Sequence, residues 1–402
     1  MPDKQNIAVV FGGRTCEHDV SVITGHQVLE NADRNKYELI PVYISRDGRW
    51  YTGSRLLDIG FLNAFDPREV TQVHIESTYD ARGLYESNPR GGLFRSGRAA
   101  LHTLDAVIPA MHGMNGEDGT LQGLLEIAGI PYAGPGVFGS AVGMDKIGMK
   151  RFFMGSGFPV LPFASLERGQ WEQDAVAVIA RIEKTLRYPM FVKPANLGSS
   201  IGITRAEDRQ GLEEAIAVAL GFDRRVLVEQ GIDCTEVNCS ALGIGCRAEA
   251  SVCEQPVSWK EFLTFDQKYM RGGKGGKDGK ETEGMRSLSR ILPAPIGDEL
   301  TDRIQKMTVD IFCAMDLKGV VRIDYMIDKA DGALYVNEIN TLPGSFAFYL
   351  WEPIGVSFPE LIDRLIGQAF EAHREKRRNN YAYGTSLLSH YRAGGRGAKG
   401  GK

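Results

Sequence analysis

Four polar residues occupy alternating positions in two neighbouring segments near the C-terminal end of the chain. Segments 320–327 and 333–340 have the composition of β-strands, and the Ala-Asp-Gly of 330–332 is typical of a hairpin loop. Because side chains alternate between the two faces of a strand, symmetrical closure of this hairpin would bring the four onto one face. They are Arg322 opposite Asn340, and Asp324 opposite Glu338.

This cluster has the composition of a metal and phosphate site. Two carboxylates and an amide oxygen suit a hard cation such as Mg²⁺, which commonly binds phosphate oxygens as well. An arginine beside them is expected in a site that also binds an anion. The alternative is the solvated polar face of an edge hairpin, but the Thr-Leu-Pro-Gly of 341–344 favours the metal site. We therefore expect a protein that handles a nucleoside triphosphate.

The composition is that of a globular protein with room for two or three domains. The chain has 402 residues, of which 43% are hydrophobic and 24% charged. A net charge of −4 argues against general nucleic-acid binding, and no apolar run reaches the ~20 residues that span a bilayer. A strand expected at 7–11 leaves no room for a signal peptide, so we expect a cytoplasmic protein with no membrane partner.

The cysteines fit the same compartment. None of them forms a CxxC pair, so we expect reduced thiols, most of them small core residues. They are Cys16, Cys234, Cys239, Cys246, Cys253 and Cys313.

Strands and helices alternate in the first third of the chain, which indicates a parallel sheet covered on both faces. The expected strands are 7–11, 38–44 and 104–110, and the expected helix is 20–32. The stretch 51–100 is rich in polar turns, and we expect an insertion of loops and short elements there.

The pattern changes from residue 144 onward. A helix at 145–153 precedes a small α+β unit, and a further sheet, to which the hairpin belongs, begins at 236–243. The expected strands of the unit are 188–193, 201–204 and 225–229, with a helix at 211–220. A helix at 298–315 has an apolar stripe that would pack beside the further sheet. The Gly/Lys-rich 271–280 and the basic C-terminal tail have the composition of mobile segments.

Several loops could contact a nucleotide or a substrate. Residues 193–200 join two antiparallel strands and could present N–H groups, hydroxyls and a lysine to phosphate, although they are not a Walker loop. Segment 228–236 ends a buried strand, where the backbone could bind the edge of adenine and a carboxylate could bind the ribose hydroxyls. Loops 11–21 and 112–119 follow strand ends, where open α/β sheets bind ligands, which favours a substrate crevice.

Taken in order, these segments resemble the ATP-grasp superfamily and, within it, the D-alanine–D-alanine ligases. The resemblance runs from about residue 7 to about residue 352, and its strongest motifs are 11–21, 112–146, 191–200 and 337–344. It implies an α/β plus α+β fold, with an N-terminal Rossmann-like parallel sheet domain followed by a two-subdomain ATP-grasp fold. The expected boundaries are 1–143, 144–235, 236–372 with the metal site, and 373–402 for a disordered tail.

The resemblance also implies a two-step reaction for peptidoglycan synthesis. ATP would convert the carboxylate of one D-alanine to an acyl phosphate, and the amine of a second D-alanine would then displace phosphate. Two Mg²⁺ ions, or Mn²⁺ in their place, would be held by Asp324, Glu338 and Asn340. Arg322 and the N–H of Gly344 would stabilise the oxyanion of the tetrahedral intermediate. Ligases of this family are often homodimers.

The other implied roles divide between nucleotide and amino acid. The ATP phosphates would be contacted by Lys146, Lys193, Ser200 and Lys268, and the adenine and ribose by Glu229, Ile232 and Glu236. Glu17 would bind the ammonium of the first D-alanine, with His112 nearby. Ser199 and Tyr269 would link the phosphate loop to a loop that closes over the site.

Two features concern the second substrate. Segment 262–269 ends in Lys-Tyr, which is similar to ligases that make D-Ala–D-Ala. After Gly344, however, an ungapped match puts Tyr349 where the family has a serine that helps bind the second carboxylate. The alternatives are therefore a ligase that joins D-alanine to another amino or hydroxy acid, or a catalytically idle nucleotide-binding protein. The second is disfavoured because the charged cluster and all three lysines are present.

Overall fold

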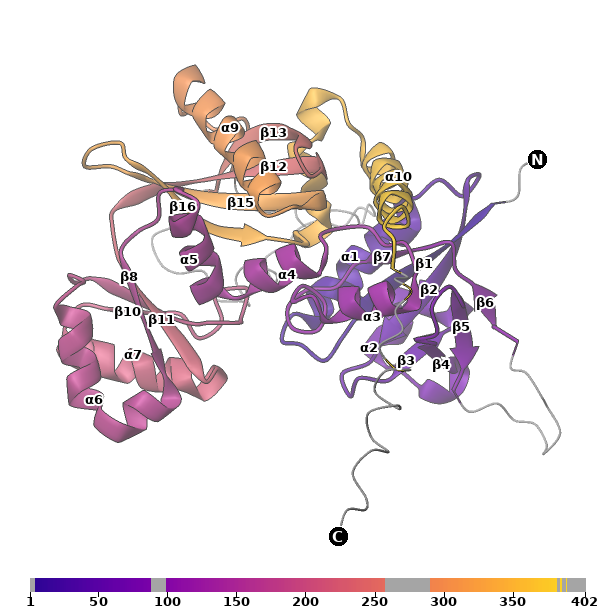
Figure 1. Cartoon of the computed structure of the whole chain (residues 1–402), viewed down its shortest axis with the longest axis horizontal. Coiled ribbons are helices and arrows are strands. Elements are labelled where there is room, and N and C mark those ends of the chain that lie inside the picture. The colour runs from indigo at the N-terminus through magenta and orange to yellow at the C-terminus, as the bar shows by residue number, and fades with distance from the viewer. Residues whose placement is uncertain (1–3, 88–98, 257–289, 382–383, 385–387, 389–402) are drawn as a thin grey trace, which may run out of the picture.

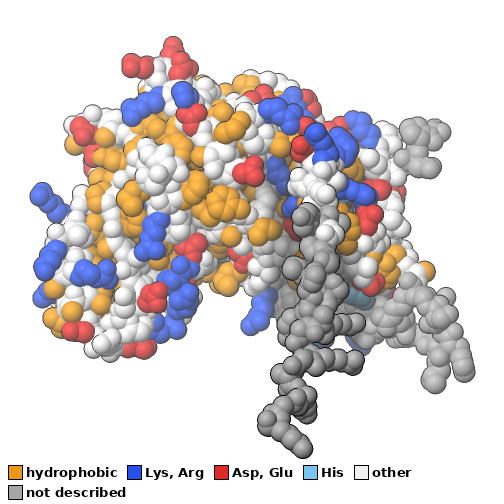
Figure 2. All heavy atoms as spheres, in the orientation of Figure 1, with side chains coloured by type: hydrophobic (Ala, Val, Ile, Leu, Met, Phe, Trp, Pro, Cys, Tyr) orange, Lys and Arg blue, Asp and Glu red, His pale blue; other side chains and the backbone are white. Residues whose placement is uncertain are grey.

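Three β-sheets form the framework of the part of the chain that the structure describes, and helices pack on each of them (Figure 1). The computed structural model describes residues 4–87, 99–256, 290–381, 384 and 388. The expected Gly/Lys-rich segment, segment 262–269 and most of the expected tail lie outside the described residues. Lys and Arg side chains lie among Asp and Glu side chains over most of the face shown in Figure 2. Within the described ranges, no helix is both long and apolar enough to span a membrane.

The N-terminal sheet has the strand order β6-β5-β4-β3-β2-β1-β7. The expected parallel pairing is confirmed for the three strands at one end of the sheet, which are β2 (Tyr37–Ile44), β1 (Gln5–Gly12) and β7 (Ala106–Pro109). The loops and short elements expected at 51–100 are confirmed, and the short strands among them, together with one more at 102–103, extend the sheet in antiparallel pairing. These are β3 (Trp50–Thr52), β4 (Thr71–Ile75), β5 (Gly83–Glu86) and β6 (His102–Thr103).

Both faces of this sheet are buried, as the sequence predicts. Alternate residues of β1 pack into two different cores, Val9 on the side of α1 and Val10 on the side of α3. The helices of this part are α1 (His18–Asn31), α2 (Ile59–Asn63), α3 (Thr120–Ala128) and α4 (Val137–Met144), with 3₁₀ turns η1 (Ser54–Leu57) and η2 (Pro67–Glu69). The C-terminal helix α10 (Phe358–Lys376) returns to pack on the α1 side.

The central sheet is antiparallel, with the order β10-β9-β11-β8. Its strands are β8 (Phe163–Glu167), β9 (Met190–Pro194), β10 (Thr204–Ala206) and β11 (Arg225–Gln230). Helices α6 (Arg168–Glu183) and α7 (Arg209–Phe222) cover one face, at the lower left of Figure 1, and α5 (Lys146–Gly155) packs on β11. The expected α+β unit is therefore confirmed, with β8 and α6 added to it.

The third sheet is also antiparallel and has the order β14-β13-β12-β15-β16. Its strands are β12 (Cys234–Ile244), β13 (Arg247–Pro256), β14 (Arg290–Ile291), β15 (Lys318–Asp328) and β16 (Leu334–Asn340). Helix α9 (Asp298–Ala314) buries its apolar stripe against one face of this sheet, where it meets Val321, Ile323 and Tyr325 of β15. The opposite face is therefore left for polar side chains. Two 3₁₀ turns follow, η5 (Gly344–Leu350) and η6 (Glu352–Ile354).

One expectation about the cysteines is wrong. Cys246, in the turn between β12 and β13, forms a disulfide with Cys313 at the end of α9. The two are 67 residues apart in sequence, so no local spacing signals a pairing that only the docking of α9 creates. The other four cysteines are free thiols, and Cys239 and Cys253 among them are buried.

Candidate active site

The β15–β16 hairpin has the register that the sequence predicts at its polar end. Arg322 lies opposite Asn340, and Asp324 lies opposite Glu338. A bulge then shifts the register by one residue, so that Tyr325 pairs with Val336 and the loop does not close symmetrically. The four polar side chains nevertheless share one face because the bulge lies between them and the loop.

Hydrogen bonds join three of the four side chains, and the fourth, Glu338, pairs with a lysine of α5. Arg322 donates from Nε and Nη2 to the two oxygens of Asp324, at 2.7 and 2.9 Å, and Asn340 Nδ2 donates to Asp324 at 3.1 Å. Lys146 Nζ, at the start of α5, lies 3.3 Å from Glu338 Oε2. Burial raises the pKa of Asp324, and Arg322 opposes that shift. A carboxylate in such a position is stabilised in its charged form by neighbouring cations.

This oxygen donor set fits a magnesium ion that shares its coordination with phosphate. Two carboxylates and one amide supply hard ligands from two rigid strands. In the part of the chain that the structure describes, no group of three or more His, Cys, Asp or Glu side chains forms a self-sufficient metal site. An ion here would therefore need Asn340 and a bound phosphate to complete its coordination.

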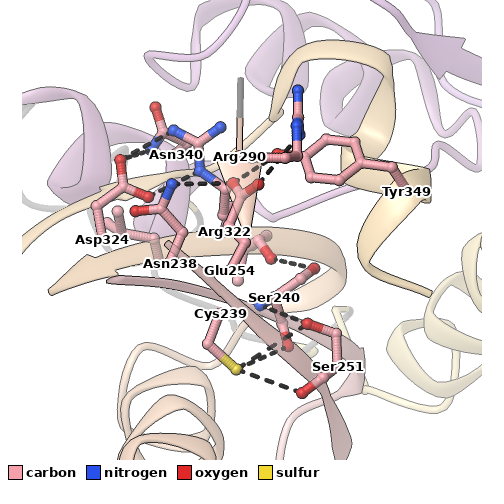
Figure 3. A network of polar contacts seen from close by, with 12 residues as sticks. Asn238, Cys239, Ser240, Ser251, Glu254, Arg290, Arg322, Asp324, Asn340 and Tyr349 are labelled. Atoms are coloured by element: carbon pink, nitrogen blue, oxygen red, sulfur yellow. Dashed lines mark hydrogen bonds and ion pairs between the residues drawn. The ribbon is translucent and has the colours of Figure 1, made fainter. Parts of the chain in front are cut away.

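The polar face extends two strands further than the sequence predicts (Figure 3). Asn238 of β12 lies opposite Asp324, and Glu254 of β13 lies opposite Asn238. One row thus crosses four strands in the order Glu338, Asp324, Asn238, Glu254. Asn238 and Glu254 belong to strands that are distant in sequence from the hairpin, so only the sheet order brings them into the row.

A buried cluster of two lysines and a glutamate lies between the central and third sheets. Lys193 Nζ donates to Glu229 Oε2 at 2.8 Å, and Lys150 Nζ of α5 lies 2.5 Å from Glu229 Oε1. Lys150 also donates to the carbonyl of Val336 in β16 at 3.1 Å. Burial alone would raise the pKa of Glu229, but the two lysines more than offset it and hold that pKa below its ordinary value.

Sequence reasoning missed Lys150, although a signal was present. Lys150 follows Lys146 by four residues, so the two lie on one face of α5, and both are buried. Of the residues expected at the adenine and ribose, Glu229 is 1% exposed beneath Lys193, while Ile232 is half-buried and Glu236 is exposed. Glu236 still lies close enough to Lys193 to raise its pKa.

Three segments distant in sequence meet around the carboxylate of Glu17. The hydroxyl of Ser199, in the loop after β9, donates to Glu17 Oε1. A Cβ on Gly198 would lie 2.7 Å from Glu17 Oε2, and one on Gly113 would lie 2.8 Å from the same atom. The missing side chains let both loops approach this carboxylate closely, and Gly113 also has a left-handed backbone, with φ 75°, that favours glycine. The contact between Glu17 and Ser199 joins two predicted site residues that the sequence did not place together, and Ser200 follows in a half-buried position.

His112 joins the N-terminal domain to the segment around Gly344. Its Nε2 lies 2.8 Å from Thr24 Oγ1 in α1, and the same hydroxyl oxygen accepts the N–H of Ser345 at 3.3 Å. The ring is 4% exposed, and burial lowers the pKa of His112 to about 4. The imidazole is therefore neutral near pH 7.

Glu117 is a half-buried carboxylate near Glu17 that sequence reasoning missed. It accepts the N–H of Gly113 at 2.6 Å and the N–H of Leu342 at 3.2 Å, so it ties the 112–119 loop to the turn before Gly344. Burial and the neighbouring Glu17 raise the pKa of Glu117 to about 8, while these N–H groups and Lys146 oppose the shift. Its position in the His-Gly-Met-Asn-Gly-Glu segment was the available signal.

The segment after Gly344 is strained and buried. Ser345, Phe346 and Ala347 all have left-handed backbone angles, with φ between 50° and 53°. Tyr349 is 5% exposed, and its hydroxyl donates to Glu254 Oε1 at 2.8 Å. The last two predicted site residues, Lys268 and Tyr269, lie outside the described residues.

Known proteins resemble the chain along nearly its whole length. Models of the D-ala D-ala ligase N-terminus and C-terminus match residues 6–135 and 152–367. The D-alanine–D-alanine ligase of Thermoanaerobacter sp. (strain X514) is 39% identical over 379 residues, 93% of this chain and 99% of the relative. The D-alanine–D-alanine ligase of Thermosipho africanus (strain TCF52B) is 36% identical over 383 residues, 95% of this chain and 98% of the relative.

Solved structures agree. The VanG D-Ala:D-Ser ligase from Enterococcus faecalis superposes with a TM-score of 0.76 at 31% identity, covering 91% of this chain and 100% of that one. The D-alanine–D-alanine ligase from Coxiella burnetii has a TM-score of 0.76 at 25% identity, covering 98% and 99%. The expected ATP-grasp fold is confirmed by these superpositions. With both family models matched and relatives at 36–39% identity over almost the full length, the chain belongs to the D-alanine–D-alanine ligase family.

Proposed function

We propose that this chain uses ATP to join two molecules of D-alanine into D-alanyl-D-alanine, releasing ADP and phosphate, and so supplies a peptidoglycan precursor. The relatives named D-alanine–D-alanine ligase support this reaction. The observation that carries the proposal is the position of Lys146. Its ammonium pairs with Glu338 on the polar face of the third sheet and also acts on Glu117, the neighbour of Glu17. The proposed phosphate site around Glu338 and the proposed amino-acid site around Glu17 therefore lie on either side of the Lys146 ammonium.

In the first step, the chain would bring a carboxylate to the γ-phosphate of ATP. Glu17, held by Ser199, would bind the ammonium of the first D-alanine and so orient its carboxylate. Lys146 and Lys193 would offset the negative charge of the phosphates. Asp324, Glu338 and Asn340 would hold magnesium, which when bound would neutralise the transferring phosphate. Attack by a carboxylate oxygen on the γ-phosphorus then gives the acyl phosphate and ADP.

In the second step, the amine of the second D-alanine would attack the acyl carbon and phosphate would leave. Arg322 and the N–H of Gly344 are the proposed donors to the oxyanion that forms on that carbon. Arg322 is anchored by its fork on Asp324, so its orientation is fixed before the reaction. The acyl phosphate hydrolyses in water, so a buried site favours transfer to the amine.

One observation supports a second candidate, a ligase with a different second substrate. Tyr349 stands where the family has serine, and a structure at 31% identity is named a D-Ala:D-Ser ligase. We also infer that the protein works in the cytoplasm, where ATP and precursor synthesis coincide, and that it forms a homodimer, as ligases of this family often do.

The experiment is ATP-dependent phosphate release with D-alanine alone, and then with D-lactate, D-serine, glycine or L-alanine added, with mass spectrometry of the products. Release with D-alanine alone and a D-Ala–D-Ala product would support the proposal. If release requires a second amino or hydroxy acid other than D-alanine, the proposed mechanism would stand and the second substrate would be that compound. Absence of release with every pair, despite ATP binding, would refute the proposal in favour of an idle nucleotide-binding protein.

A further inference from the structure

The hydroxyl of Tyr349 is committed to a protein partner. A phenol has one proton to donate, and Tyr349 donates it to Glu254 Oε1 at 2.8 Å. Burial raises the pKa of Tyr349, which keeps this proton in place. Tyr349 therefore cannot at the same time donate to the carboxylate of a substrate, as a serine at this place does in the family. Some other group must hold the carboxylate of the second amino acid.

Glu254 also positions Arg290 beside Tyr349. Its Oε1 also accepts Asn238 Nδ2 at 3.0 Å, and its Oε2 accepts Arg290 Nη1 at 3.1 Å. The Arg290 guanidinium lies over the Tyr349 ring, with Cζ 3.8 Å from the ring centroid (Figure 3). The carboxylate and the aromatic ring together hold this guanidinium in position. The Arg290 side chain is only 12% exposed and the Glu254 side chain 4%.

The row across the third sheet shows what this arginine adjoins. Glu338 and Asp324 form the phosphate end of the row, Arg322 lies beside Asp324, and Glu254 forms the far end. Strands are spaced about 4.8 Å apart, so Glu254 lies about 10 Å from Asp324 on the same face. The order along the sheet is therefore phosphate, oxyanion donor, then Arg290. In the second step, Arg322 would hold the oxygen on the acyl carbon, and the second amino acid would approach that carbon from the side away from the phosphate. Its own carboxylate would then point toward Arg290.

We propose that Arg290, oriented by Glu254 and Tyr349, binds the carboxylate of the second amino acid and so replaces the serine that serves this purpose in the family. The inference rests on the proposed function and names the group that recognises its second substrate. A guanidinium can hold a carboxylate through two parallel hydrogen bonds, which a hydroxyl cannot. Glu254 and Tyr349 are positioning residues in this arrangement.

The test separates the two D-alanine sites by kinetics. The rate is measured against D-alanine concentration at saturating ATP and fitted with one Michaelis constant for each site. Arg290→Met is expected to raise the second constant about 10- to 100-fold, as for a lost charged hydrogen bond, while the constants for ATP and the first D-alanine stay within about threefold. Tyr349→Phe keeps the ring under Arg290 but removes one donor to Glu254, so it should raise the second constant clearly less than Arg290→Met does. Arg247→Met, on the same strand as Glu254 but with a 73% exposed side chain, is the matched control.

The inference would be overturned by either of two patterns among the variants, or by an Arg290→Met protein that behaves as the wild type. One pattern is a large rise of the second constant in Tyr349→Phe with none in Arg290→Met, because the hydroxyl would then be the ligand. The other pattern is an equal rise of all constants in Arg290→Met, because the role would then be structural. If Arg290→Met fails to fold, Arg290→Lys keeps the charge without the fork and should raise only the second constant. Wild-type protein that makes no D-Ala–D-Ala would refute the proposed function, whereas active wild type with an unaffected Arg290→Met would refute Arg290 alone.

Discussion

Lys150 and Glu229 form an ion pair at 2.5 Å in which both side chains are 1% exposed. Lys193 occupies the other oxygen of the same carboxylate, so two ammonium groups share one negative charge. Lys150 therefore compensates Glu229, and under the proposed function the charge of Lys193 is then left for an arriving phosphate. Through the carbonyl of Val336, Lys150 also ties the central subdomain to the strand that carries Glu338 and Asn340.

Replacing Lys150 by methionine should weaken ATP binding. Glu229 would then hold Lys193 alone, so we expect the Michaelis constant for ATP to rise about tenfold and the free energy of unfolding to fall by about 3–5 kcal/mol. The double variant Lys150→Met/Glu229→Gln should recover much of both losses because no buried charge is left without a partner. Lys184→Met, at an exposed position of the same subdomain, is the control. A folded Lys150→Met protein with normal ATP kinetics would contradict this role.

Glu338→Gln should abolish turnover and leave the fold intact. The amide keeps the shape of the side chain but removes the charge that pairs with Lys146 and that a magnesium ion would need. Turnover should fall by at least about 100-fold, with a melting temperature close to that of the wild type. The check is phosphate release and thermal unfolding, beside Asp310→Asn on the exposed face of α9. Near-normal turnover would remove the metal assignment.

The Glu17–Ser199 pair should behave as one unit in binding the first D-alanine. Glu17→Gln removes the partner of the substrate ammonium, so we expect the first D-alanine constant to rise about 10- to 100-fold with little change for ATP. Ser199→Ala should cost less, and almost nothing when added to Glu17→Gln, because the hydroxyl acts through the carboxylate. Steady-state kinetics of the two single variants and the double variant measure this coupling. Fully additive effects would mean that the two residues act separately.

Acid should destabilise the protein in part through His112. Its pKa is about 4 in the folded chain and near 6.5 when unfolded, so the unfolded chain takes up the proton first as the pH falls. The contribution of His112 is complete above about pH 6.5 and is lost on the way to pH 4, which amounts to about 2–3 kcal/mol at pH 4.5. Urea unfolding of wild type and His112→Gln at neutral and acid pH tests this. The stability gap between them should narrow on acidification, and a constant gap would argue against a neutral buried imidazole.

The sequence predicts the part of the site that is local. Arg322, Asp324, Glu338 and Asn340 lie within one hairpin, where strand periodicity alone assigns them to one face, even though a bulge makes the loop asymmetric. The parallel strands β2, β1 and β7 of the first sheet are predictable as well, because each is a short apolar run. The weak strands of 51–100 are not, since their pairing depends on an edge that the rest of the sheet supplies.

Contacts between distant segments could not be predicted. Glu254 reaches the polar row only because β13 pairs with β12 and β12 with β15. The Cys246–Cys313 disulfide likewise depends on the packing of α9. The partner of Tyr349 also comes from this sheet order, so the sequence could identify a departure from the family at Tyr349 but not what the hydroxyl does.

The central claim is tested most directly by following an oxygen atom. D-Alanine labelled with ¹⁸O in its carboxylate is incubated with the protein, ATP and Mg²⁺, and both phosphate and dipeptide are measured by mass spectrometry. A D-alanine–D-alanine ligase that forms an acyl phosphate should transfer one ¹⁸O to each phosphate released and make one D-Ala–D-Ala with it. Unlabelled phosphate, or phosphate without dipeptide, would contradict the account.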